Sequence, residues 1–241
     1  PFYGAGAWTI SVALNGDIDN YQGLRKELEK EGELIAPEVT TDTKIIPLII
    51  EKYLQQGDDL ITAFRRAVND FEGSHAIAMT SNIEPDKVFL ALKGSGQALY
   101  VGIAPDQYVF SSELYGLVEV TPFFIKMDGE TPRIPHVPDT AGQIFILNQE
   151  SPGGLEGISA FCYDSASLNI QEEHIRKAEM TTRDIDRGGY PHYFLKEITE
   201  SAFSVKKTLR GKYLVTEGKM GKAVVFNLGE DVVPAELRDA L

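Results

Sequence analysis

Residues 8–30 read WTISVALNGDIDNYQGLRKELEK, and this stretch sets the order of the first elements. Residues 8–14 are rich in side chains that favour a β-strand. Asn15-Gly16 ends this run, and residues 21–30 then follow a helical pattern that ends near Gly32. The sequence therefore predicts a strand, a turn and a helix in this part of the chain.

The Asn15-Gly16 pair offers two hydrogen-bond donors at the end of the predicted strand. An asparagine amide beside a glycine N–H can converge on a carbonyl oxygen that becomes negatively charged, as acyl-transfer chemistry requires. The same dipeptide also marks ordinary turns. The residues alone leave two interpretations open, an oxyanion site and a strand-exit turn.

Length and composition indicate a soluble globular protein. With 241 residues and 43% hydrophobic content, the chain can bury a sizeable core. Its apolar stretches are far shorter than the roughly 20 residues of a membrane span, and nothing resembles a signal peptide. The single cysteine, Cys162, fits a reducing compartment, so we expect a cytoplasmic location. The net charge of −13 argues against a nucleic-acid surface.

Two further helices and an antiparallel meander follow. The helices are expected at residues 41–57 and 60–71, and Pro47 is compatible with the first of them only in its first turn. From Gly73 the apolar pattern changes to a period of two, with short runs at 75–80, 87–92, 98–103, 107–111, 122–127 and 143–147. Helices followed by short strands favour an α+β layered architecture over a doubly wound parallel sheet.

The last part of the chain has a different composition. Residues 151–187 show no sustained period outside 170–179, so we expect a linker with one helical segment. The composition changes again at Gly188. Residues 193–210 predict an amphipathic helix, and residues 223–227 predict an apolar strand.

Three stretches occur in an order that is found in one enzyme family. They are VALNGDIDN at 12–20, TDTKII at 41–46 and GGYPHYFLKEI at 188–198. They resemble the strand with His-Asn-Gly, the Asp-Thr-Glu-Val-Ile string and the Tyr-x-His-Tyr-Met-x-Lys-Glu-Ile string of the glutamine–fructose-6-phosphate aminotransferases, the glucosamine-6-phosphate synthase family. Further landmarks match in order at 93–95, 102 and 111–117.

The resemblance implies a four-layer α/β/β/α sandwich of the N-terminal-nucleophile (Ntn) hydrolase type. In this family a cysteine at the first position of the mature chain attacks the side-chain amide of glutamine, and the released ammonia aminates fructose 6-phosphate to glucosamine 6-phosphate. Asn15 and Gly16 would be the oxyanion donors, and Asp42 would bind the α-ammonium group of glutamine. Taken by itself, Asp42 is also typical of a helix N-cap, and one residue can have both roles.

The sequence departs from the family at several positions. It lacks the Cys-Gly-Ile opening and the Arg-Trp-Ala-Thr-His-Gly loop, and Leu14 stands where the family usually has histidine. Cys162 is internal and has no free α-amino group, so it cannot replace the nucleophile. We therefore expect an N-terminally incomplete glutaminase domain that is inactive by itself. Its unpaired sheet edges would need a companion segment that carries the cysteine, or a rearranged or dimerised sheet.

The expected organisation is a partial glutaminase domain over 1–150, a linker over 151–187 and a junction helix over 188–241 that leads to a sugar-isomerase domain. The expected partners are glutamine, fructose 6-phosphate through the isomerase domain, the missing N-terminal segment and a second copy in a homodimer. We expect no cofactor, nucleic acid or membrane partner. No metal site is expected either, because the histidines lack ligand spacing; they are His75, His136, His174 and His192.

Two alternatives stay open. One is a degenerate, non-catalytic module that binds a metabolite or supports dimerisation of the isomerase half. The other is an amidotransferase that delivers ammonia to a different acceptor, because the sugar-phosphate site would lie beyond Leu241.

Overall fold

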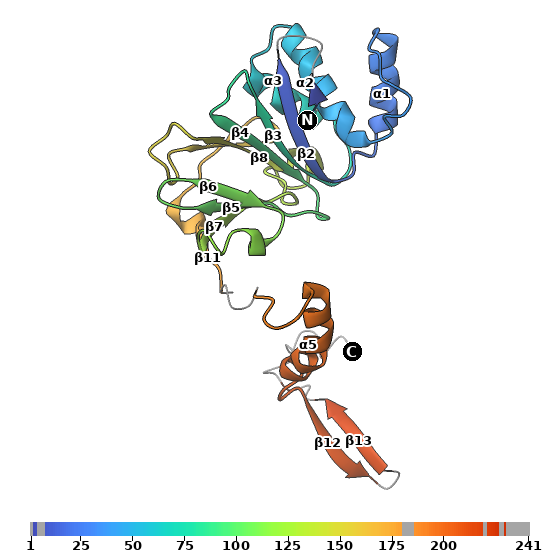
Figure 1. Cartoon of the computed structure of the whole chain (residues 1–241), viewed down its shortest axis with the longest axis vertical. Coiled ribbons are helices and arrows are strands. Elements are labelled where there is room, and N and C mark those ends of the chain that lie inside the picture. Colours follow the sequence, from blue (N-terminus) through green and yellow to red (C-terminus); the bar gives the residue numbers. More distant parts are fainter. Residues whose placement is uncertain (1, 4–7, 180–185, 219–220, 227–228, 230–241) are drawn as a thin grey trace. The chain divides into compact units, whose positions relative to one another are not determined.

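The computed structural model describes residues 2–3, 8–179, 186–218, 221–226 and 229. The chain divides into two compact units, Pro1–Asp184 and Ile185–Leu241 (Figure 1). The first unit therefore extends well past residue 150, where the sequence predicted the end of the glutaminase domain.

The first unit is built on a seven-stranded antiparallel sheet with the order β1-β2-β3-β4-β8-β9-β10. The strands are β1 (Phe2–Tyr3), β2 (Thr9–Gly16), β3 (His75–Ser81), β4 (Lys87–Lys93), β8 (Gln143–Asn148), β9 (Ile158–Cys162) and β10 (Ser167–Leu168). The predicted strand at residues 8–14 is β2, and it lies next to the meander.

A second sheet of four antiparallel strands has the order β11-β7-β5-β6. Its strands are β5 (Tyr100–Ile103), β6 (Tyr108–Ser111), β7 (Phe123–Lys126) and β11 (Arg176–Lys177). Leu90 and Phe145 of the larger sheet share a buried cluster with Val101 and Ile125 of the smaller sheet. The two sheets therefore pack face to face around an apolar layer.

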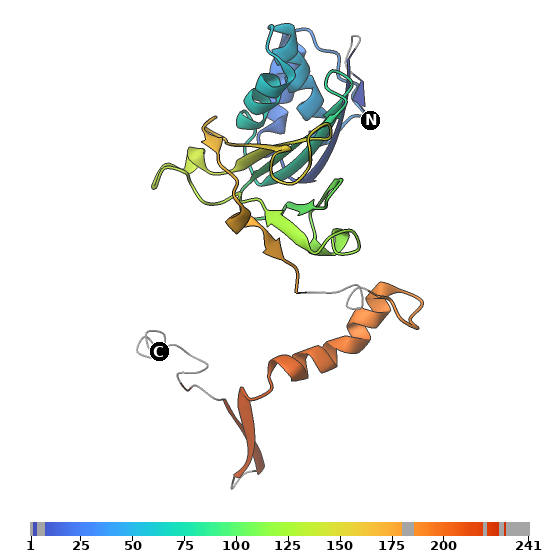
Figure 2. The ribbon, with the colours of Figure 1, turned by 90° about the vertical axis from the view of Figure 1, so that its left-hand side faces the viewer.

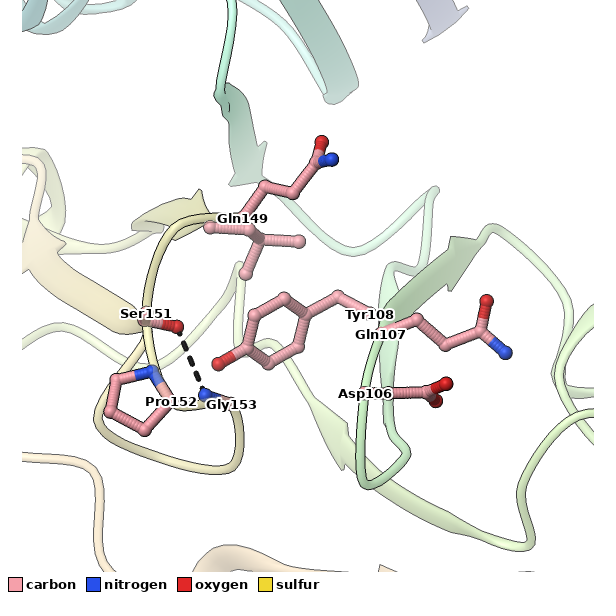
Figure 3. A pocket seen from close by; sticks show the side chains of 8 residues that line it. Asp106, Gln107, Tyr108, Gln149, Ser151, Pro152 and Gly153 are labelled. Carbon is pink, nitrogen blue, oxygen red and sulfur yellow. Dashed lines mark hydrogen bonds between the residues drawn. The ribbon is translucent and has the colours of Figure 1, made fainter.

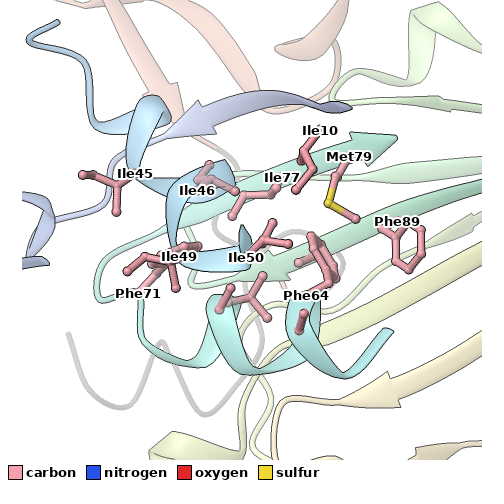
Figure 4. Close-up of a cluster of buried hydrophobic side chains, with 14 of the residues drawn as sticks. Ile10, Ile45, Ile46, Ile49, Ile50, Phe64, Phe71, Ile77, Met79 and Phe89 are labelled. Atoms are coloured by element: carbon pink, nitrogen blue, oxygen red, sulfur yellow. The ribbon is translucent and has the colours of Figure 1, made fainter. Parts of the chain in front are cut away.

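Three helices cover the other face of the larger sheet (Figures 1 and 2). They are α1 (Tyr21–Lys30), α2 (Ile45–Gln55) and α3 (Leu60–Asn69), and the short 3₁₀ turn η1 (Asp42–Lys44) precedes α2. Pro47 lies in the first turn of α2, as the sequence predicts. Figure 4 shows the resulting core, in which α2 and α3 side chains meet those of the sheet; the labelled members include Ile46, Ile49, Ile50, Phe64, Ile77, Met79 and Phe89.

This arrangement confirms the predicted fold class, an α+β sandwich of two antiparallel sheets. In the described part of the first unit, α1, α2 and α3 all contribute to the core on the larger sheet. The described part shows no α-helix on the outer face of the smaller sheet, so the fourth layer of the expected sandwich is not among these elements.

The prediction of a linker over 151–187 was wrong up to Lys177. This range contains β9, β10, the 3₁₀ turn η4 (Glu172–His174) and β11. β9 pairs with β8, where Phe161 lies opposite Ile144, and β11 pairs with β7. Strands of two to five residues are too short to show an alternating pattern, and their partners are distant in the sequence.

The second unit contains helix α5 (Tyr193–Thr208) and the hairpin of β12 (Tyr213–Gly218) and β13 (Gly221–Phe226). The helix and the apolar strand predicted from the sequence are therefore present, and only Asn227 of that strand lies outside the described residues. No described residue of this unit is buried. None of the described helices is long and apolar enough to cross a lipid bilayer.

Candidate functional site

Gly16 has a backbone conformation and a close contact that exclude other residues. Its φ angle is +112°, and a Cβ atom added to it would lie 2.2 Å from the backbone oxygen of Ser74. Beyond Gly16 the chain stays beside the segment that precedes β3, because the N–H groups of Asp17 and Asp19 donate to the carbonyls of Ser74 and Glu72. The dipeptide therefore ends β2 without reversing the chain, and Gly16 supplies the positive φ angle at the strand end.

The Asn15 side chain lies at the edge of a cavity of about 560 Å³. Residues of both sheets line this cavity, including Gln97 from the loop after β4, Ser112 after β6 and Lys126 of β7. Asn15 is exposed, and among the described residues its amide has no hydrogen-bond partner. The amide is thus available to a ligand, and the cavity has the size of a small-molecule site.

Asp42 is the first residue of η1 and holds the segment that follows β2. Its Oδ2 atom accepts a hydrogen bond of 3.0 Å from the N–H of Ile18. The N-cap position of η1 is Thr41, and no side-chain capping bond is formed there. The helix N-cap interpretation of Asp42 is therefore not what the structure shows, because its carboxylate binds the backbone of a different segment.

The structure places Asn15 and Asp42 in different cavities. Asp42 lines a more open depression of about 420 Å³ together with Asp17, Asp19 and Thr43. The two cavities are close, because Ile18 is two residues from Gly16, a span of at most about 7 Å. The shared role of Asn15, Gly16 and Asp42 at one glutamine therefore stays a prediction.

A buried pair lies directly behind Gly16, and sequence reasoning missed it. His75 is opposite Gly16 in the register of β2 and β3, and its Nε2 atom is 3.0 Å from the Tyr163 hydroxyl. Burial, with a smaller effect from Lys93, lowers the pKa of His75 to about 4. Burial also raises the pKa of Tyr163. Both side chains are therefore neutral, and only the strand register reveals their proximity to the site.

The structure also describes the environment of Cys162 and the arrangement of the metal-ligand residue types. Cys162 is buried in β9, and burial, followed by the charge of Asp164, raises the pKa of its thiol. A protonated, buried thiol is a poor nucleophile. Among the residues that the structure describes, no group of three or more His, Cys, Asp or Glu side chains could hold a metal ion.

A separate cavity of about 430 Å³ lies between the β5–β6 turn and the β8–β9 loop. The Tyr108 hydroxyl is already used, since it donates to the Gly154 carbonyl at 2.6 Å. Figure 3 shows the amides of Gln107 and Gln149 directed away from the Tyr108 ring. The polar groups of this cavity do not converge, so it is not the candidate site.

Residues 1–119 match a family model described as a glutamine amidotransferase domain. The glutamine–fructose-6-phosphate aminotransferase (isomerizing) of Methanothermobacter thermautotrophicus is 32% identical over 222 residues, which cover 92% of this chain and 32% of that protein. The enzyme of the same name from Acidithiobacillus ferridurans is 32% identical over 84% of this chain and 29% of its own length.

A solved structure shows the same fold. Glutamine phosphoribosylpyrophosphate amidotransferase from B. subtilis superposes with a TM-score of 0.51 at 20% identity, over 70% of this chain and 31% of its own. The present chain spans about a third of the length of the curated relatives that it matches. Residues 1–119 of the chain thus match a glutamine amidotransferase domain, the chain is similar to the glutamine–fructose-6-phosphate aminotransferases, and its fold is like that of the solved amidotransferase.

Proposed function

We propose that this chain is the glutamine-binding part of an aminotransferase that releases ammonia from glutamine to convert fructose 6-phosphate into glucosamine 6-phosphate. The names of the curated relatives support this activity for a longer protein. The observation that carries the proposal is the strand end at Asn15-Gly16, where an unpaired amide borders a cavity of about 560 Å³.

In this proposal Asn15 and Gly16 donate hydrogen bonds to the oxygen of the tetrahedral intermediate. A single donor of this kind contributes about 3–4 kcal/mol to the transition state in well-studied hydrolases. The conformation of Gly16 supports the assignment, because a side chain at this position would collide with the Ser74 backbone. Asp42 would bind the α-ammonium group of glutamine from the adjacent depression.

We expect this chain by itself to bind glutamine without hydrolysing it. Its one cysteine is internal and buried, so neither a free α-amino base nor an exposed thiolate is present beside it. A nucleophilic cysteine would come from a companion segment, and fructose 6-phosphate would bind to a sugar-isomerase domain. A homodimer and a cytoplasmic location stay predictions.

The test uses the full open reading frame from which the chain comes. Its product should release ammonia from glutamine and should be labelled by a thiol-reactive glutamine analogue. Asn15→Ala should lower the rate of hydrolysis by about 100-fold or more, because it removes one oxyanion donor. An inert, unlabelled full-length protein would overturn the proposal.

A second candidate function is a non-catalytic module that binds glutamine or a related metabolite and supports dimerisation of an isomerase half. The residue that favours it is Leu14, which stands where the family usually has histidine. A full-length protein that binds glutamine but forms neither ammonia nor a covalent adduct would establish this alternative.

A further inference from the structure

The loop after β4 places Gln97 against the candidate oxyanion glycine. A Cβ atom added to Gly16 would lie 3.0 Å from Gln97 Cγ, so the aliphatic part of this side chain lies along the Gly16 backbone. The sequence alone assigns no role to Gln97. The contact becomes visible only when β2 and the β4–β5 loop are brought together.

Hydrogen bonds connect the loop that carries Gln97 to two neighbouring segments. The Gly94 N–H donates to the Gly129 carbonyl at 2.8 Å, and the Gly96 N–H donates to Ser74 Oγ at 2.9 Å. Gly94 has a φ angle of +85°, and a Cβ atom there would lie 2.7 Å from Ser74 Oγ. Gln97 is therefore held by a constrained backbone, as the side chains of a preorganised site are.

The carboxamide of Gln97 is available to a ligand. The side chain is half-buried and lines the same cavity of about 560 Å³ as Asn15. Within the described ranges of the chain, its amide has no hydrogen-bond partner. A partly buried carboxamide gains most from a ligand that uses both its N–H donors and its carbonyl acceptor.

We infer that Gln97 is a specificity-determining residue that recognises the side-chain carboxamide of glutamine beside Asn15 and Gly16. This inference rests on the proposed glutamine site. A primary amide presents both a donor and an acceptor, so it satisfies both groups of Gln97. The carboxylate of glutamate only accepts, so it leaves the Gln97 carbonyl unpaired, and a site with such unpaired groups rejects the wrong ligand.

The test is a pair of titrations of this chain, with L-glutamine and with L-glutamate, followed by nuclear magnetic resonance. Gln97→Met keeps the aliphatic contact with Gly16 and removes the amide, and Gln97→Ala serves as a second variant. We expect Gln97→Met to bind L-glutamine about five- to ten-fold more weakly and to lose most of the preference over L-glutamate. Gln149→Met removes the same amide from the separate cavity and should change neither affinity.

The outcomes separate this inference from the proposed function. If Gln97→Met weakens both ligands equally, or neither, the specificity role is overturned. If Asp42→Asn weakens glutamine binding while the Gln97 variants do not, the glutamine site stands and the inference fails. If the unaltered chain binds no glutamine, both are overturned. The amide spectrum of each variant shows whether the fold is intact.

Discussion

Gly16 is the residue whose conformation most directly links the sequence to the candidate site. Two features disfavour a side chain at this position. The φ angle is +112°, and an added Cβ atom would lie 2.2 Å from the backbone oxygen of Ser74. We expect Gly16→Ala to lower the free energy of unfolding by about 3 kcal/mol, measured by urea denaturation.

Gly32 is the matched control for this substitution. It has a similar φ angle of +101°, but an added Cβ atom would meet nothing within 4 Å. Gly32→Ala should therefore cost only the backbone strain, about 1 kcal/mol. Equal losses for the two variants would contradict the close contact at Gly16.

His75 gives the fold a dependence on pH. Its folded pKa of about 4 lies below the ordinary value of 6.5, so the unfolded chain binds the proton more tightly. The contribution of neutral His75 is fully present above pH 6.5 and is lost as the pH falls towards 4. A shift of this size corresponds to about 3 kcal/mol.

The measurement is the free energy of unfolding from pH 7 to pH 4 for the unaltered chain and for His75→Phe. The variant should lose less stability over this range, although the loss of the Tyr163 hydrogen bond lowers its stability at pH 7. Parallel pH profiles would show that His75 titrates normally.

At the scale of elements, the sequence predicts those helices and strands that a local sequence pattern determines. Helices α1, α2 and α3 and the strands from β3 to β8 lie within a few residues of the predicted ranges, because each has a sustained period or clear boundary residues. β9, β10 and β11 were missed because they are short and depend on partners distant in the sequence. These strands form because they pair with strands distant in the sequence, and not because of their own β-propensity.

The residues of the candidate site also fall into two groups, those that sequence motifs reveal and those that only the structure reveals. Asn15, Gly16 and Asp42 could be named from motifs, since each lies in a recognisable string. Gln97 and His75 could not, because one depends on the approach of a loop and the other on the register of β2 and β3. The separation of Asn15 and Asp42 into two cavities also follows from packing, which no motif encodes.

One element boundary gives a direct test of helix capping. Asp59 precedes α3, and its Oδ1 atom accepts a hydrogen bond of 2.7 Å from the Thr62 N–H. This bond lowers the pKa of Asp59. Asp59→Ala should lower the free energy of unfolding by about 1 kcal/mol, whereas Asp59→Asn keeps an acceptor and should lose much less. Equal losses in chemical denaturation would show that the cap does not stabilise α3.

At the scale of the whole molecule, several apolar side chains of the second unit are exposed in this chain. Phe194 is 73% exposed and Phe203 is 65% exposed on α5. In this chain Phe194→Ser and Phe203→Ser should change the free energy of unfolding by less than about 0.5 kcal/mol, since neither residue is buried.

In a longer protein the same substitutions should be more costly if α5 is an interface, because exposed apolar patches commonly mark interaction sites. Thermal unfolding of the short and long forms compares the two cases. Equal small effects in both forms would show that α5 remains exposed and contributes to no interface.

The end of β2 is the proposed glutamine site. Titration of L-glutamine into this chain, followed by the backbone and side-chain amide signals, tests it most directly. We predict saturable shifts at Asn15, Gly16, Asp42 and Gln97, no release of ammonia, and a marked loss of affinity in Asp42→Asn. The absence of shifts at these residues, or unchanged binding by Asp42→Asn, would contradict the proposed glutamine site.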